Sequence, residues 1–231
     1  MDEIIQNIDE LLLKFKLIEA YNLIQKYKFT FKDAEWYIRI LKAAYIWDKI
    51  QPKRLPKREL EANYQDALQY CEAGLRLKPD CPSFLTWKGV CIDAIAKSSG
   101  INKRIEKAFE IREYWDKALK IDPNYKTALS CMGIWCFKIA NLSDIKRKLA
   151  STFFSSPPKS TYEEAIRYLI KGFDGNPHPS VILLLTIAKC YQKLGNPTRC
   201  KEFCQKVMEF PDIGYEVTEA KKQAHKLLKV L

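Results

Sequence analysis

Several patterns that carry catalytic or metal chemistry are missing from this sequence. It has only two histidines, and no pair among its eight cysteines has the C-x-x-C spacing of a zinc knuckle or a thioredoxin-like redox site. It also lacks a glycine-rich phosphate loop, a G-x-S-x-G motif and an H-E-x-x-H motif. Enzymatic function has to be argued from a site, and none is visible. We therefore expect a protein that is not an enzyme and needs no cofactor or metal.

Long hydrophobic runs are also missing. The longest nearly apolar stretch, residues 181–188, is too short to span a bilayer. The N-terminus, Met1-Asp2-Glu3, is acidic and does not resemble a secretory signal. These features predict a soluble, cytoplasmic protein with no transmembrane segment.

Most of the cysteines occupy positions where a packed helix needs a small apolar residue. They are Cys71, Cys91, Cys136, Cys190, Cys200 and Cys204. This placement favours buried, reduced thiols over a disulfide framework or a metal site.

A helix-turn-helix pattern is clearest between residues 129 and 177. The expected first helix has apolar or small residues at steps of three and four: Leu129, Met132, Gly133, Cys136 and Ile139. The second opens at Ser160, to which Glu163 can reach back as in a capping box, and ends at Gly175-Asn176-Pro177. Its expected buried face consists of Tyr162, Ala165, Ile166, Leu169 and Gly172. This pattern is typical of a tetratricopeptide-type repeat.

Similar helix pairs recur along the chain. We predict an all-α, tetratricopeptide-like helical-hairpin solenoid of about four hairpins, forming a single domain. The expected repeat units are 33–79, 83–123, 127–177 and 181–211, with a capping hairpin at 1–30 and a capping helix at 217–231. Trp36, Trp87 and Trp115 fall on packing positions and are assigned to the core.

Long basic insertions interrupt these units, in a chain with a formal net charge of +11. The first contains Lys53, Arg54, Lys57 and Arg58; the second contains Lys97, Lys103, Arg104 and Lys107; the third contains Lys146, Arg147 and Lys148. If stacking brings them to one side, their potentials sum and favour an acidic partner. The alternative is that they are solvated loops that only keep the protein soluble.

The first helices of stacked repeats usually line a concave groove. The repeat register predicts that the groove residues are Arg39, Lys42, Thr127, Ser130, Ile134, Lys138, Lys189 and Lys193. The apolar segment 149–154 is expected to fold as a helix against this groove and narrow it. A peptide or a phospholipid is the expected ligand class.

Four stretches carry a more specific resemblance. They are Gly133-Ile134-Trp135-Cys136-Phe137, the basic 146–150 segment, the Phe153-to-Pro158 turn, and Ser160-Thr161-Tyr162-Glu163-Glu164-Ala165. Their order and spacing resemble the regulator of microtubule dynamics family. The helix from Trp36 to Ala43 and the segment 183–191 are similar to two further helices of that family. The resemblance implies a divergent, non-enzymatic tetratricopeptide domain associated with microtubules, the spindle and spindle poles.

From charge and resemblance together we predict a microtubule-associated protein that acts in spindle dynamics and chromosome segregation. Its basic insertions would bind the acidic segments of tubulin. The alternative is a module that holds a phospholipid or a partner peptide in the groove, since some relatives implied by the resemblance bind lipid. Nucleic acid is a minor alternative, because the basic clusters contain few aromatic residues.

Overall fold

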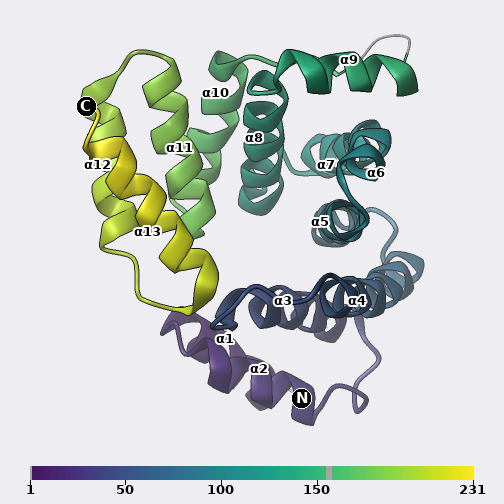
Figure 1. Ribbon diagram of the computed structural model, residues 1–231. Helices are drawn as coiled ribbons and strands as arrows, with labels where there is room; N and C mark the ends of the chain where they lie inside the picture. Colours follow the sequence, from purple (N-terminus) through teal and green to yellow (C-terminus); the bar gives the residue numbers. More distant parts are fainter. Residues whose placement is uncertain (1, 155–157) are drawn as a thin grey trace.

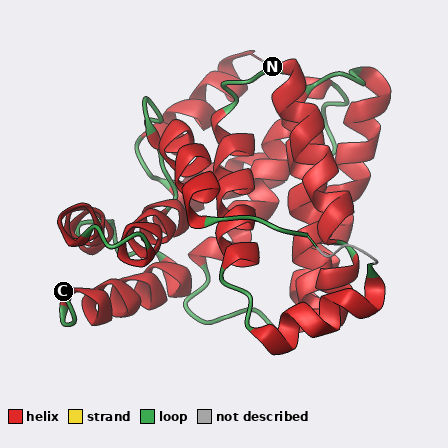
Figure 2. Cartoon of the chain, turned by 90° about the horizontal axis from the view of Figure 1, so that it is seen from above, coloured by secondary structure: helices red, strands yellow, loops and turns green. Residues whose placement is uncertain are grey.

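The computed structural model describes residues 2–154 and 158–231, with the backbone alone at Asp144, Lys146 and Ala150, and every regular element in these ranges is a helix (Figure 1, Figure 2). The helices are α1 (Asp2–Leu13), α2 (Leu17–Lys26), α3 (Ala34–Ile50), α4 (Lys57–Leu77), α5 (Pro82–Ser99), α6 (Ile101–Glu106), α7 (Ala108–Ile121), α8 (Lys126–Ala140), α9 (Asp144–Phe153), α10 (Tyr162–Phe173), α11 (Val181–Lys193), α12 (Pro197–Met208) and α13 (Gly214–Leu228). The predicted all-α class is confirmed for this part of the chain.

Most helices pack against their near neighbours in sequence, as in a solenoid. The main pairs are α3 with α4, α4 with α5, α5 with α7, α8 with α10, and α11 with α12. Figure 1 shows these helices following one another around a ring, so that α13 returns to the side of α3, which it also contacts. The array is therefore closed by contacts between its two ends.

The pairing of α8 with α10 follows from the apolar periodicity of the two helices. All five predicted core positions of α8 are buried, as are Ala165, Leu169 and Gly172 on α10. A Cβ atom at Gly133 would lie 2.7 Å from Leu169 Cγ and 2.8 Å from the Leu169 backbone nitrogen. The absence of a side chain at Gly133 is therefore what allows the helices to approach so closely.

The cap of α10 lies one residue later than predicted. Thr161, and not Ser160, is the N-cap: its side chain accepts a 3.1 Å hydrogen bond from the Glu164 backbone nitrogen. The Ser160 hydroxyl donates a 2.7 Å bond to the Glu164 carboxylate. Thr161 has the extended backbone conformation that an N-cap requires, which decides the register.

Much of each basic insertion is helical. Helix α5 continues to Ser99, and the chain then turns at Gly100, where φ is +112°, before α6 begins. The first insertion is irregular only from Gln51 to Pro56, because α4 begins at Lys57. Two prolines account for that break.

Helix α9 does not lie against the groove as expected. It packs on α6, and the ring of Phe154 just beyond it meets Phe109 edge-to-face at 4.7 Å. Phe109 belongs to α7, the second helix of its pair, so this apolar segment covers the end of that pair and does not narrow the groove.

The expected core aromatic residues are buried. Trp36 is fully buried, and Trp87 and Trp115 are 7% and 4% exposed. The six cysteines assigned to packing positions are also buried, which raises the pKa of the Cys91 and Cys190 thiols to about 12. These thiols therefore act as small apolar core groups.

Candidate functional site

The first basic insertion presents four exposed cations between α3 and α4. Lys53, Arg54, Lys57 and Arg58 are all exposed, and none of the carboxylates whose side chains the structure describes forms an ion pair with them. Lys57 and Arg58 stand in the first turn of α4, where the helix dipole disfavours positive charge. An external anion would therefore be stabilised by them.

The second insertion is largely neutralised by its own neighbours. Arg104 donates two 2.6 Å hydrogen bonds to the carboxylate of Asp93 on α5, in a fork-to-fork pair. Lys103 pairs with Glu106 at 2.8 Å, and Lys107 pairs with Glu110 at 2.7 Å. Only Lys97, exposed near the end of α5, forms no ion pair among the described residues.

The third insertion places Arg147 and Lys148 on α9, where both are exposed. The side chain of Lys146 lies outside the described residues. Arg147 donates a 3.1 Å hydrogen bond to the carbonyl oxygen of Ala140, which fastens α9 to the end of α8. Because α9 contacts α6, the second and third insertions are adjacent.

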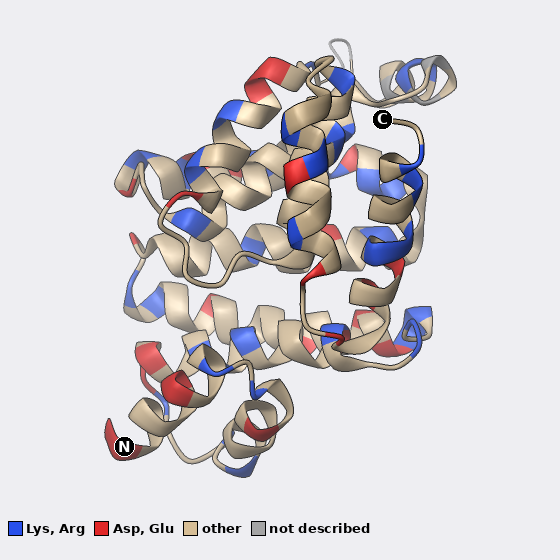
Figure 3. Cartoon of the chain, turned by 90° about the vertical axis from the view of Figure 1, so that its left-hand side faces the viewer, with Lys and Arg blue, Asp and Glu red and all other residues tan. Residues whose placement is uncertain are grey.

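The first insertion approaches the second through Lys97. Burial lowers the pKa of Lys97, and the positive charges of Lys49, Arg104 and Arg54 lower it further. The Ser98 hydroxyl, next to Lys97, donates a 3.2 Å hydrogen bond to Glu61 of α4, so the end of α5 lies against the start of α4. Figure 3 shows that Lys and Arg on the side facing the viewer are spread over several helices, with Asp and Glu among them. The basic residues on that side are therefore interspersed with acidic ones.

Two of the predicted groove residues take part in packing instead. Arg39 is 7% exposed, and its guanidinium donates a 2.6 Å hydrogen bond to Asp9 of α1, because the α1–α2 hairpin covers that face of α3. Ser130 donates a 2.8 Å bond to the Lys126 carbonyl and lies against Gly172 of α10. The predicted register therefore misplaces both residues.

The other groove candidates are more accessible. Lys138 and Lys193 are exposed, and Lys42, Thr127, Ile134 and Lys189 are partly buried. Ile134 packs against the core formed by α7, α8 and α10 to α13. Burial lowers the pKa of Lys42 and Lys189. Lys42 and Lys189 therefore stand in more densely packed surroundings than an open groove would provide.

Asp93 joins three helices on the inner side of the ring. Besides its pair with Arg104 of α6, one carboxylate oxygen lies 3.8 Å from the Lys138 Nζ of α8. Burial alone would raise the pKa of Asp93, but Lys138 and Arg104 outweigh it and hold that pKa below its usual value. This cluster was not predicted, although a single acidic residue inside the apolar run of α5 was a sequence signal for it.

Lys138 remains the residue with the least compensated charge in this cluster. Although 47% of its side chain is exposed, the surrounding protein lowers its pKa to about 8, mainly through loss of hydration. Asp93 opposes that shift, and Arg104 and Lys97 add to it. An added anion near Lys138 would therefore be favoured.

Replacing Lys138 with methionine is expected to raise the melting temperature at pH 7 by roughly 2–4 °C, corresponding to ~1 kcal/mol after allowance for solvent screening. The charged form is the one disfavoured by folding, so the native stability rises as pH increases from about 8 to 10.5. The gain of the variant over the parent should shrink across that range. Thermal melts at pH 7 and pH 10 measure both effects; a variant that is less stable at pH 7 would contradict them.

Side chains from distant helices also meet inside the ring. Burial raises the pKa of Tyr45 on α3, and the nearby Glu216 of α13 and Cys131 of α8 raise it further. The Tyr64 hydroxyl donates a 3.2 Å hydrogen bond to Asp48, which in turn pairs with Lys49 at 2.9 Å. The inner face is therefore occupied by interacting polar side chains.

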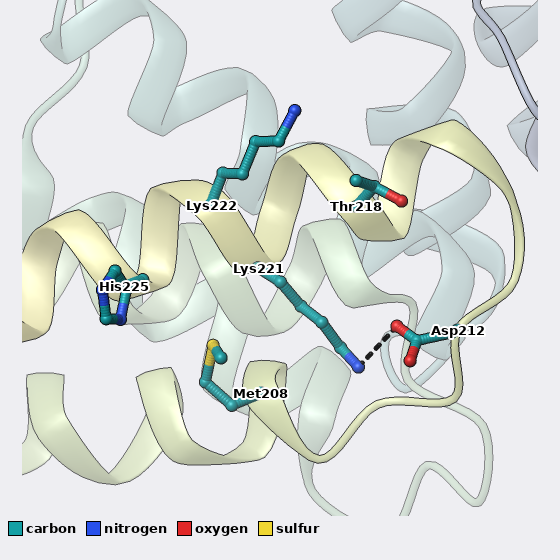
Figure 4. Close-up of a pocket in the computed structure, with 6 residues that line it drawn as sticks. All are labelled: Met208, Asp212, Thr218, Lys221, Lys222 and His225. Atoms are coloured by element: carbon teal, nitrogen blue, oxygen red, sulfur yellow. Dashed lines mark hydrogen bonds and ion pairs between the residues drawn. The ribbon is translucent and has the colours of Figure 1, made fainter.

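Two shallow depressions lie at the C-terminal end and not on the inner face. The first, of about 320 Å³, lies between α12 and α13 and is lined by Met208, Asp212, Thr218, Lys221, Lys222 and His225 (Figure 4). The second, of about 280 Å³, is lined by Gln192, Gly195, Asn196, Pro197, Val230 and Leu231. Lys221 and Asp212 form a 2.7 Å ion pair across the first, so its charges already satisfy one another.

Within residues 2–154 and 158–231, no helix is both long and apolar enough to cross a membrane. The same ranges hold no group of three or more histidine, cysteine, aspartate and glutamate side chains suited to a metal ion.

The fold is shared with tetratricopeptide-repeat proteins. The crystal structure of a thermophilic TPR protein from Thermus thermophilus superposes with a TM-score of 0.59, over 99% of this chain and 98% of that one, at 11% identity. At this identity the likeness concerns the fold alone. It confirms the predicted tetratricopeptide-like solenoid.

Sequence comparison identifies closer relatives. The mouse protein described as regulator of microtubule dynamics protein 1 is 29% identical over 99% of this chain and 74% of its own length. Mouse regulator of microtubule dynamics protein 3 is 28% identical over 69% of this chain and 34% of its own length. The model of the family described as regulator of microtubule dynamics protein 1-3 matches residues 4–231. The chain belongs to that family, as the sequence resemblance predicted.

Proposed function

We propose that this protein regulates microtubules by binding the acidic segments of tubulin through its basic insertions. The observation that carries the proposal, beside the family, is the set of exposed cations on neighbouring insertions. They come from the α3–α4 connection and from α9, with Lys97 between them. Family members are described as regulators of microtubule dynamics.

The ion pairs change which residues we assign to the first contact. Lys103, Arg104 and Lys107 are engaged by Glu106, Asp93 and Glu110, so they contribute less free charge than the sequence implies. The cations available to tubulin are Lys53, Arg54, Lys57, Arg58, Arg147 and Lys148. The surface therefore has two cationic poles, the first and the third insertion, on either side of the partly neutralised second insertion.

A flexible acidic chain suits such a surface better than a rigid partner does. Exposed charges accelerate encounter and give modest affinity each, because water and salt screen them. Two separated cationic poles can hold two acidic stretches at once, and a polymer with repeated acidic tails then adds avidity. We place the protein in the cytoplasm, on microtubules and at the spindle and its poles, with a role in chromosome segregation.

The test is co-sedimentation with polymerised tubulin over a salt series, with and without removal of the acidic tails. Combining Arg147→Glu and Lys148→Glu should weaken binding about tenfold, since two attractions are replaced by two repulsions. Adding Lys53→Glu and Arg54→Glu should abolish pelleting at moderate salt. Cleavage of the tails should weaken the parent and remove most of the difference between parent and variants.

A matched control changes the net charge equally at the opposite ends of the same helix pairs. Lys120 and Lys171 are exposed in the last turns of α7 and α10. The pair Lys120→Glu and Lys171→Glu should pellet much as the parent does. Equal loss in both variants would mean that overall charge, and not the insertions, drives the association. Equal binding by all variants would overturn the proposal.

A second candidate is an anionic ligand, phospholipid or peptide, on the inner face. Its support is the under-compensated charge of Lys138 beside Lys97. Native mass spectrometry of freshly purified protein tests it: a co-purified phospholipid or peptide, lost in the variant Lys138→Met, supports this candidate. Bare protein in every preparation would count against it.

A further inference from the structure

The two ends of the repeat array meet at a seam between α3 and α13. The Lys49 Nζ lies 2.7 Å from the carboxylate of Glu216, and the side chains are 22% and 24% exposed. One residue before Glu216, the backbone nitrogen of Tyr215 donates a 2.7 Å hydrogen bond to the carbonyl oxygen of Gln51. The start of α13 thus rests on the end of α3, so the positive end of one helix dipole meets the negative end of the other.

Gly214 fits this contact because it has no side chain. Its φ is +70°, and a Cβ atom there would lie 1.9 Å from the Lys49 carbonyl oxygen. Backbone cannot move aside as a side-chain tip can, so any other residue would hold the two helix ends apart. The seam is therefore shaped for direct backbone contact.

Phe15, between α1 and α2, completes the seam from the other side. Its ring meets Phe210, at the end of α12, at 5.8 Å and His178, after α10, at 5.2 Å, both edge-to-face. Phe15 is also the one non-glycine residue with positive φ among those described, at +55°. For a bulky side chain this conformation is strained and persists only where its surroundings hold it.

The seam is thinner than the interface between the two helices of a pair. It consists of one backbone hydrogen bond, one ion pair and the aromatic contacts of Phe15, and both ring nitrogens of His178 are buried without a partner among the described residues. By contrast, α8 and α10 bury continuous apolar faces against each other. Elements held by few contacts open before the rest of a fold unfolds.

We propose that this seam is a latch, which opens and closes while the helix pairs on either side stay folded. In the closed form the inner charges around Lys49, Asp48 and Glu216 satisfy one another. Opening separates these charges and exposes them to solvent. The inference rests on the seam contacts and does not depend on tubulin binding.

Hydrogen exchange of the full chain, resolved to single amides, tests the latch. The amide of Tyr215 should exchange at least about tenfold faster than the buried amides of α8 and α10, since it opens without global unfolding. Combining Phe15→Ala with Glu216→Lys should raise the Tyr215 rate about tenfold further and leave α8 and α10 unchanged. Small-angle scattering should show a larger radius of gyration at unchanged helical circular dichroism.

The control Glu113→Lys makes the same charge change at an exposed ion pair with Lys117 on α7, remote from the seam, and should alter neither measurement. Exchange of Tyr215 at the same rate as the α8 and α10 amides would overturn the proposal, because the seam would then open only with the whole fold. If the double variant loses its helical circular dichroism, the test is the exchange rate of the Tyr215 amide in the parent protein, compared with the α8 and α10 amides.

Discussion

Replacing Trp36 with alanine is expected to lower the free energy of unfolding by about 3–5 kcal/mol, a fall of roughly 6–20 °C in melting temperature. Trp36 is fully buried in α3, and its ring meets Phe31 edge-to-face at 5.0 Å. With Ile8 and Ile24 it forms the cluster that holds α1 and α2 on α3. Its removal leaves a large cavity at the point where the N-terminal hairpin is attached.

Trp47→Ala on the same helix is the matched control for this prediction. Trp47 is only partly buried and stacks on Tyr21 at 5.1 Å, so the loss should be about 1–2 kcal/mol. Thermal and denaturant unfolding of both variants measure the difference. Equal losses would show that Trp36 contributes no more to the free energy of unfolding than the partly buried Trp47 does. Because Phe15 follows α1, Trp36→Ala should also speed exchange of the Tyr215 amide.

Replacing Asp93 with asparagine is expected to cost about 2 kcal/mol at pH 7, less than the 3–5 kcal/mol of a fully buried pair because Asp93 is 24% exposed. The change keeps the shape but leaves Arg104 and Lys138 without their counter-charge. The folded-state pKa of Asp93 is lowered, so its contribution is complete above the usual value of 3.8 and is lost as pH falls through the folded value.

The difference between parent and Asp93→Asn should therefore be constant from pH 7 down to about pH 4 and shrink below it. Urea unfolding at a series of pH values measures this. Asp80→Asn, at an exposed turn after α4, is the control and should change stability little at any pH. A difference that grows as the solution is acidified would refute the role assigned to Asp93.

The sequence carries enough information to predict the helices and most of their buried faces. Periodic apolar positions such as Met132 and Leu169 identify the α8–α10 pair, because a helix buries one face and that face repeats every three to four residues. Short helices are harder. Residues 101–106 form α6, yet one and a half turns contain too few positions to show a period.

The candidate binding surface was less predictable, because the sequence alone does not reveal which charged residues pair with one another. Arg104 and Arg147 look equivalent in the sequence, but Arg104 is bound by Asp93, eleven residues earlier, while Arg147 remains exposed. The contact between Lys49 and Glu216 joins residues that are 167 positions apart in the sequence. It depends on the accumulated geometry of every helix pair between them, which no local pattern records.

The closed seam has a consequence for how the length of this chain can vary. An open array of repeats tolerates duplication or deletion of a unit, because each unit touches only its neighbours. Here, one unit more or fewer would rotate Glu216 away from Lys49 and leave Gly214 without the carbonyl it is shaped to meet. The seam contacts therefore require the present number of helix pairs. Residues can be added in the connections between paired helices, such as 51–56, because insertions there do not change the number of helix pairs in the ring.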